Sequence, residues 1–206
     1  MPPRPLSQAQ HADRQALILR QTRALAREVG WGGVTMRAVA ERSGLSAPSV
    51  YEQFAGKDAL LAAVATAGFG ELATALRAEA GAGLRWCAQR YWRFAEDDPQ
   101  LYELMFHRPL TLPFASATTP AELHDGFAAL ASHVVAAARG VGITLSESDT
   151  ATEAWWSALH GTVSLLLSGR LRPHAETLLQ IAADTFTAGL RAGALDPAND
   201  PKGMPS

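Results

Sequence analysis

Residues 46–57 carry the side chains whose types and spacing most clearly suggest chemistry, namely the binding of nucleic acid. Ala47, Pro48 and Ser49 are short or rigid, so a helix beginning here could bring its backbone close to base edges in a major groove. Side-chain donors that could reach phosphate follow at regular intervals. They are Tyr51, Gln53 and Lys57.

Aromatic side chains in the remaining two thirds of the chain suit a small-molecule pocket, because rings with a few polar groups line such pockets. The alternative interpretation is that these rings form the hydrophobic core, and we expect several of them, though not all, to line a pocket. A histidine on an apolar helix face, such as His160, is more often a core residue than a ligand contact. The candidates are Trp86, Trp92, Tyr102, Met105, Phe106, Phe127, Trp155, Trp156 and His160.

Enzyme chemistry finds little support in the sequence. The patterns G-x-S-x-G, H-E-x-x-H, G-x-x-x-x-G-K-[ST] and G-x-G-x-x-G after a strand are absent. Cys87 is the single cysteine, and the six histidines show no spacing of four. The sequence therefore predicts no cofactor, no metal site and no catalytic residue.

The candidate nucleic-acid residues must be positioned by short helices. Apolar spacing predicts a helix over 14–30, then short helices over 36–42 and 47–53 with Thr35 and Ser46 as their N-caps. The apolar face of the first helix is predicted to consist of Ile18, Thr22, Leu25 and Val29.

A helix-turn-helix accounts for the spacing of the two short helices. Ala40 is small enough for close helix approach, and Gly44 tolerates the positive φ of the turn. Apolar side chains would clamp the inside of the turn. They are Val39, Leu45 and Val50.

Composition and charge agree with a folded, helical protein in which one part meets phosphate. The chain of 206 residues is 48% hydrophobic and 18% charged, without strand-like alternation, and predicts an all-α fold of about nine helices. The first 60 residues hold eight basic and five acidic residues, whereas the remainder is acidic. No secretory signal is visible, and no membrane-spanning stretch is expected, so a cytoplasmic location is predicted.

The expected organisation has four parts: a flexible arm over 1–10, a DNA-binding domain over 11–55, an effector-binding and dimerisation domain over 56–193, and a disordered tail over 194–206. Within the third part, a connecting helix over 56–78 is followed by shorter helices and a loop over 108–120. Two long helices, over 147–168 and 173–192, carry small residues that suit tight helix packing, either in a four-helix dimer interface or in an internal core face.

Several helix ends have chemical signals. Asp98-Pro99 is an N-cap followed by proline, Thr119-Pro120-Ala121-Glu122 is a predicted capping box, and Ser146 with Asp149 is a weaker capping pair. Glycines at 140, 142 and 169 are expected to end two further helices.

The N-terminal motifs together resemble the TetR family of bacterial repressors over about residues 16–62. The motifs are GWGGVTMRAVA at 30–40, SGLS at 43–46 and VYxxFxxKDxL at 50–60. The C-terminal motifs PxLYxLMF at 99–106 and WxxLHG at 156–161 are similar to a C-terminal domain type of that family named for a Trp-His-Gly signature. Two departures are Ala26, where a large aromatic residue is common, and Gln53, where histidine is common.

This resemblance implies an all-α homodimer that binds palindromic operator DNA and is released by a small apolar or aromatic effector, with no membrane partner. The N-terminal part would be a three-helix DNA-binding domain, and the C-terminal part a helical bundle for ligand binding and dimerisation. Position by position, bases would face Ala47, Pro48, Ser49 and Tyr51. Phosphates would be held by Thr35, Arg37, Tyr51, Gln53 and Lys57.

Two other functional classes stay open at the level of sequence. An all-α enzyme without a recognisable catalytic motif is one, and a protein-interaction bundle is the other. The bundle would explain the C-terminal helix faces but not the arrangement of Ala40, Gly44, Tyr51 and Lys57. The sequence does not distinguish repression from activation, and identifies neither the effector nor the operator.

Overall fold

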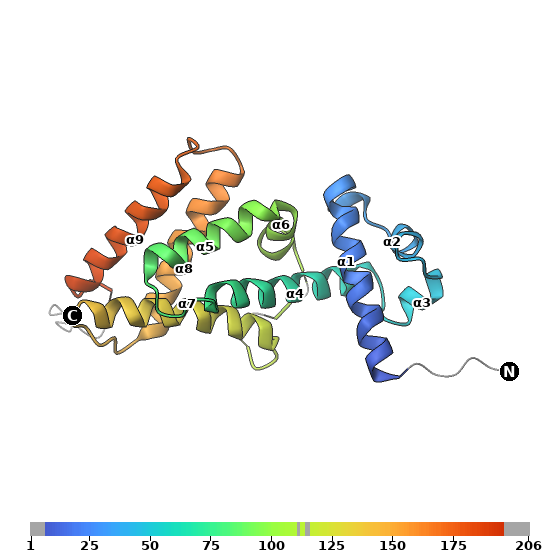
Figure 1. Ribbon diagram of the computed structural model, residues 1–206, viewed down its shortest axis with the longest axis horizontal. Coiled ribbons are helices and arrows are strands. Elements are labelled where there is room, and N and C mark those ends of the chain that lie inside the picture. The colour runs from blue at the N-terminus through green and yellow to red at the C-terminus, as the bar shows by residue number, and fades with distance from the viewer. Residues whose placement is uncertain (1–6, 111, 114–115, 196–206) are drawn as a thin grey trace, which may run out of the picture. The chain divides into compact units, whose positions relative to one another are not determined.

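The computed structural model describes residues 7–110, 112–113 and 116–195, and within these residues all regular secondary structure is helical. The predicted all-α fold is therefore confirmed, with nine helices in the described part of the chain (Figure 1). The helices are α1 (Gln8–Gly33), α2 (Met36–Ser43), α3 (Ala47–Tyr51), α4 (Lys57–Arg77), α5 (Leu84–Asp97), α6 (Pro99–His107), α7 (Ala121–Gly140), α8 (Ser148–Leu167) and α9 (Ala175–Arg191).

The chain divides into two compact units. The first unit contains Met1–Gly68 and Gln100–Thr119, and the second contains Phe69–Pro99 and Pro120–Ser206. One division falls inside α4 and another at the start of α6, whereas the sequence placed the boundary between the DNA-binding domain and the C-terminal domain after residue 55. Of the predicted tail over 194–206, residues 196–206 lie outside the described residues.

Helix α1 begins earlier than predicted. Ser7 forms a capping box with Gln10, in which the Ser7 hydroxyl accepts from the Gln10 N–H at 3.3 Å and the Gln10 side chain accepts from the Ser7 N–H at 2.9 Å. Residues 8–10 are therefore helical, although they were expected to belong to the flexible arm. Residues 1–6 of that arm lie outside the described residues.

The buried face of α1 is nearly the predicted one. Ile18, Thr22 and Leu25 are buried, but Val29 is 52% exposed, so its assignment to the core face was wrong. Gly30 has φ 68° and interrupts the helix, which leaves residues 31–33 as a separate turn. Because the chain changes direction there, Val29 lies beside the turn rather than in the core, 2.7 Å from where a Cβ on Gly33 would lie.

The two short helices form as the capping residues predicted. The Thr35 hydroxyl accepts from the Ala38 N–H at 3.2 Å, and the Ser46 hydroxyl accepts from the Ser49 N–H at 3.3 Å. Gly44 ends α2 with φ 66°, as the turn requires. Helix α3 ends at Tyr51, two residues before the predicted end.

The second unit is a bundle in which α5, α7, α8 and α9 pack against one another. Aliphatic and aromatic residues of these helices fill its interior. In Figure 1, α8 and α9 are the orange and red helices of this unit. The predicted helices over 147–168 and 173–192 correspond to α8 and α9.

Helix α4 carries the predicted apolar stripe, and its six members are all buried. They are Leu60, Leu61, Val64, Phe69, Leu72 and Leu76. By length and composition alone α4 is the one helix of the described residues that could cross a membrane. Its longest run without a charged residue, over 59–70, is shorter than the roughly 18 residues that a membrane span needs. Half of its apolar window is buried inside the protein, and a core helix passes the same test. This single helix is weak evidence for a membrane span.

Two of the predicted helix caps are not made. Helix α7 has Pro120 as its N-cap with no side-chain cap, because the Thr119 hydroxyl instead accepts from the Ser116 N–H at 3.0 Å. Helix α8 begins after Glu147, also without a side-chain cap, so Ser146 is not its N-cap. The glycine signals at the opposite helix ends are confirmed, since Gly142 and Gly169 have φ of 80° and 67°.

Candidate nucleic-acid interface and aromatic body

Helix α3 presents an exposed surface because one buried residue anchors it. Val50 is fully buried, whereas its neighbour Tyr51 is 54% exposed. Pro48 lies in the first turn, where its missing N–H leaves no helical bond unmade, and is exposed. The predicted base-facing residues Ala47, Pro48, Ser49 and Tyr51 are thus all wholly or partly open to solvent.

Thr35 and Arg37 lie at the start of α2 and are exposed. The Thr35 hydroxyl is used as an N-cap, but a hydroxyl keeps one donor for a further partner. Arg37 donates to Glu41 at 2.9 Å in a pair whose side chains are 88% and 67% exposed. Such an exposed pair is weak, so a phosphate could compete for the guanidinium.

The remaining two predicted phosphate donors contact other parts of the first unit. The Gln53 amide lies 3.0 Å from Nδ1 of His11, which is in the first turn of α1. The Lys57 ammonium donates to the main-chain carbonyl of Trp31 at 3.1 Å. An ammonium has three donors, so Lys57 keeps two for another acceptor.

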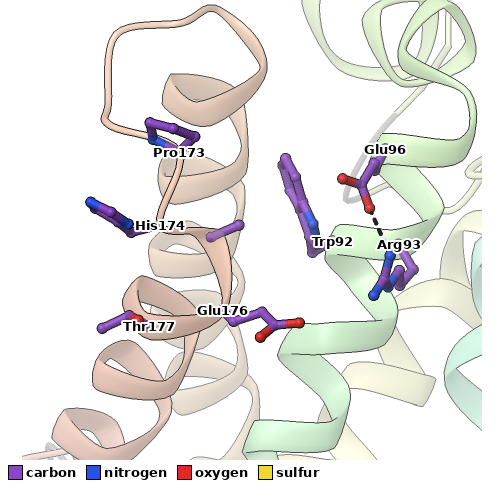
Figure 2. A pocket seen from close by; sticks show the side chains of 8 residues that line it. Trp92, Arg93, Glu96, Pro173, His174, Glu176 and Thr177 are labelled. Atoms are coloured by element: carbon purple, nitrogen blue, oxygen red, sulfur yellow. Dashed lines mark hydrogen bonds and ion pairs between the residues drawn. The ribbon is translucent and has the colours of Figure 1, made fainter.

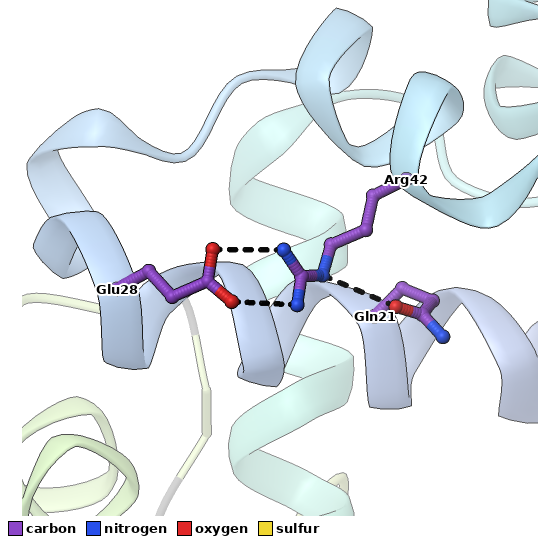
Figure 3. Close-up of polar contacts among 3 residues, drawn as sticks. All are labelled: Gln21, Glu28 and Arg42. Carbon is purple, nitrogen blue, oxygen red and sulfur yellow. Dashed lines mark hydrogen bonds and ion pairs between the residues drawn. The ribbon is translucent and has the colours of Figure 1, made fainter.

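Arg42 joins α2 to α1 through a bidentate ion pair (Figure 3). Its two terminal nitrogens donate to the carboxylate oxygens of Glu28 at 2.7 and 2.8 Å, and its Nε donates to Gln21 at 3.2 Å. Parallel hydrogen bonds of this kind fix direction as well as distance. The contact therefore fixes α2 on α1, and α3 follows α2 after a short turn.

The nine predicted ligand residues are divided between the two units. Tyr102, Met105 and Phe106 are in the first unit, where Tyr102 and Met105 are buried and the rings of Tyr102 and Phe106 lie 4.7 Å apart. The other six are in the second unit. They are Trp86, Trp92, Phe127, Trp155, Trp156 and His160.

Trp155 lies in the core of the second unit. It is fully buried, and its ring lies 5.2 Å from that of Phe186. Cys87 is buried in the same unit, and burial raises the pKa of its thiol to about 12. For Trp155, the structure therefore agrees with the alternative interpretation of the sequence, in which the aromatic rings form the hydrophobic core.

Trp86, Trp156 and His160 are only partly buried and have polar neighbours. Trp86 has the Arg90 guanidinium 5.6 Å from its ring centroid. The Trp156 indole donates to the Tyr91 hydroxyl at 3.1 Å, and the ring of His160 lies 6.4 Å from that of Trp156. Phe127 is half-buried on α7.

A pocket of about 360 Å³ lies between α5 and the start of α9, and it contains Trp92 (Figure 2). Figure 2 shows the Trp92 ring and the Glu176 carboxylate extending into the space between the two helices. Glu96 accepts from Arg93 at 3.1 Å on the α5 side. The remaining lining residues are Pro173, His174, Ala175 and Thr177.

Two family models match the chain. The model described as bacterial regulatory proteins, TetR family, matches residues 18–64, and the model described as the tetracyclin repressor-like C-terminal domain matches residues 84–192. The second alone covers more than half of the chain. The chain belongs to the TetR family. Its helix-turn-helix is therefore the DNA-binding part of a transcription regulator, and the likeness to the Trp-His-Gly type stays a prediction.

Solved structures show the same fold as this TetR-family chain. A protein with unknown function from Rhodococcus sp. RHA1 is 24% identical, with a TM-score of 0.72 over 93% of this chain and 99% of that one. A TetR-family transcriptional regulator from Streptomyces coelicolor is 20% identical, with a TM-score of 0.60 over 92% of each chain. A TetR transcriptional regulator from Rhodococcus sp. RHA1 is 22% identical, with a TM-score of 0.60 over 87% and 97%. No curated protein matches the sequence.

Several residues of the TetR-family chain that the sequence did not single out lie at these sites. His11 and Arg42 contact partners that are 42 and 14 residues away in sequence. His133 is buried beneath Trp86, with ring centroids 5.3 Å apart, and its Nε2–H donates to the Leu76 carbonyl in the last turn of α4 at 2.9 Å. No short motif contains these pairs, so only the fold could reveal them. Within the described ranges, no three His, Cys, Asp or Glu side chains are grouped to hold a metal.

Proposed function

We propose that the protein is a homodimeric transcriptional repressor that binds palindromic operator DNA and is released by a small apolar or aromatic effector. The observation that carries this proposal is the exposed surface of α3, which is anchored by buried Val50 and capped by Ser46. A short helix held in this way can enter a major groove with its N-terminal residues toward the bases.

The proposed DNA contacts are the exposed and half-exposed residues of α2, α3 and the start of α4. Ala47, Pro48, Ser49 and Tyr51 would face the bases, with apolar contact to thymine methyl groups. Thr35, Arg37, Tyr51, Gln53 and Lys57 would hold phosphate oxygens. Phosphate contacts release counterions, so binding should weaken steeply as salt rises.

Dimerisation is proposed through α8 and α9. Ile181 is 56% exposed and Leu165 is 39% exposed, and the small residues Ala154 and Ala158 are exposed on the same helices. Two such helices from each copy would form a four-helix interface around a twofold axis. The two α3 helices would then enter major grooves about 34–36 Å apart. Sedimentation of the purified protein tests the dimer, and a monomer at micromolar concentration contradicts it.

The effector is proposed to bind among the aromatic residues of the C-terminal part. It would act by binding more tightly to a state in which the spacing of the two α3 helices no longer matches the DNA grooves, because only a difference in affinity shifts an equilibrium. The partly buried rings of Trp86, Trp92 and Trp156 support an aromatic or apolar ligand. Binding should quench tryptophan fluorescence, and a panel of apolar compounds without any response contradicts this step. We place the repressor in the cytoplasm, where its operator would be.

The central experiment is selection of bound sequences from a randomised DNA duplex by the purified protein, followed by footprinting on the DNA upstream of its own gene. We expect an inverted repeat whose half-sites are centred about one helical turn apart. Recovery of unrelated sequences with no repeat would contradict operator binding.

The contact residues are tested by Tyr51→Ala and Lys57→Ala. Each should weaken binding about tenfold, and Lys57→Ala should reduce the slope of log affinity against log salt by about one. Arg170→Ala is the control, because Arg170 is an exposed cation of the second unit. If both variants bind as the wild type does, the contact assignments are wrong.

A further inference from the structure

The turn over residues 31–33 is separated from the rest of α1. Gly30, at φ 68°, breaks the helix, so the hydrogen-bond ladder of α1 does not set the position of this turn. Gly32 and Gly33 have no side chain to anchor it. Trp31 is therefore the side chain that can hold the turn in place, and it is 1% exposed.

The indole of Trp31 is fixed by a hydrogen bond to another element of the first unit. Its Nε1–H donates to the main-chain carbonyl of Gln100, the second residue of α6, at 2.7 Å. A carbonyl oxygen has two lone pairs, so this one can accept the indole in addition to a helical N–H. A short bond between a buried ring and a helix backbone leaves the ring one position.

The main chain of the same residue holds a proposed DNA contact. The Trp31 carbonyl accepts from the Lys57 ammonium at 3.1 Å. Lys57 is the first residue of α4, and its side chain is partly buried. A lysine side chain has many rotamers in solution, and ordering them opposes binding. A fixed carbonyl beside the ammonium reduces that cost before DNA arrives.

We propose that Trp31 is a positioning residue for the Lys57 phosphate contact, anchored by its indole bond to Gln100. This inference rests on the proposed function, since it attributes the ordering of the Lys57 side chain to a residue that would not itself touch DNA. The indole bond holds the turn, the turn places the Trp31 carbonyl, and the carbonyl aims the ammonium.

Trp31→Phe tests this series of contacts, because phenylalanine keeps a buried ring but lacks the N–H donor. We expect DNA affinity to fall about three- to tenfold, the effect of one hydrogen bond. The same substitution in a Lys57→Ala background should cost less than twofold, because the residue through which Trp31 acts is then absent. The probe is the duplex recovered by selection, at several salt concentrations.

Thr22→Val is the matched control. It deletes a buried side-chain hydrogen bond of the same unit, the 2.8 Å bond from Thr22 to the Ile18 carbonyl, which does not touch Lys57. Its affinity for DNA should stay within twofold of the wild type. If Trp31→Phe does not fold, site-specific 3-benzothienylalanine at position 31 removes the same N–H with almost no change in shape.

Two results would overturn the inference while the proposed function stands. One is wild-type affinity in Trp31→Phe or in the benzothienyl variant. The other is an equal loss with and without Lys57, which is the result expected of a merely structural role. If the wild-type protein binds no duplex at all, the proposed function itself is wrong and this inference with it.

Discussion

The two compact units differ in how their candidate site residues are held. In the first unit, most of the proposed DNA contacts lie on or beside two short helices that begin at local hydrogen bonds, in which the Thr35 and Ser46 hydroxyls accept from N–H groups three residues further along the chain. In the second unit, Trp155 is buried while Trp92 lines a pocket, although both are tryptophans in amphipathic helices. Local capping can be deduced from neighbouring residues, whereas the depth of a ring depends on helices distant in sequence.

The largest expected effect is a difference in stability between variants of a core tryptophan and a pocket tryptophan of the second unit. Trp155→Ala should lower the free energy of unfolding by about 3–5 kcal/mol, because it leaves a large cavity. Trp92→Ala should cost about 1 kcal/mol, because Trp92 is only half-buried. Urea unfolding measures both. Equal losses would show that the two tryptophans do not differ in this way.

The next effect is a pH dependence that belongs to the second unit. Burial raises the pKa of the Cys87 thiol to about 12, so the folded protein keeps a proton that the unfolded chain releases above its ordinary pKa of about 8.5. Stability should therefore fall as pH rises from about 8.5 toward 12, with a slope approaching 1.4 kcal/mol per pH unit from this group.

Urea unfolding between pH 8 and 10.5 measures that slope. The variant Cys87→Ala is the control, because it lacks the thiol and should show a smaller decrease with pH. An identical slope in the variant would mean that Cys87 ionises as easily in the folded protein as in the unfolded chain.

A smaller effect is expected at the cap of α3 in the first unit. Ser46→Ala should lower the free energy of unfolding by about 1 kcal/mol and weaken DNA binding, because the cap sets the first turn of α3. Ser168→Ala, at the exposed end of α8, should stay within about 0.5 kcal/mol. Thermal unfolding and gel shift measure the two properties. A Ser46 variant with unchanged DNA affinity would show that α3 does not depend on its cap.

The smallest effect on stability is expected at the Arg42–Glu28 pair. The two side chains are 33% and 56% exposed, so Arg42→Ala should cost less than about 1 kcal/mol, and salt should reduce the difference. DNA affinity should still fall two- to threefold, because the pair holds α2 on α1.

The matched variant is Arg85→Ala, because Arg85 makes a similar two-bond contact with Asp184 in the second unit at 2.7 Å. It should leave DNA affinity unchanged. Equal effects of the two variants on DNA binding would remove the special role of the Arg42 contact.

Much of the first unit could be predicted from its sequence. The N-caps Thr35 and Ser46 and the turn at Gly44 are as expected, because each depends on residues within three or four positions. The early start of α1 was missed because three prolines among the first five residues suggested an arm, although the Ser7–Gln10 capping box is also local. Val29 was misplaced because the periodicity of α1 was extended to Gly30 without the change of direction there.

The aromatic residues of the C-terminal part could be recognised as a group, but the sequence did not show which are buried and which line a pocket. Nothing near Tyr102 or Trp155 in sequence distinguishes them from Trp92, yet the first two are buried and the third lines a pocket. The Trp92 pocket is completed by residues 173–177, about 80 positions further along the chain. Such a pocket cannot be read from spacing within one helix.

Helical type, helix order and the polar face of α3 follow from the amino-acid sequence, since short-range hydrogen bonds and apolar periodicity decide them. Tertiary packing alone decided that Trp31 contacts both α6 and Lys57, and that His133 lies beneath Trp86. The physical reason is one of range: a cap or a turn is satisfied by neighbours along the chain, but burial and long-range hydrogen bonds exist only after distant helices have met.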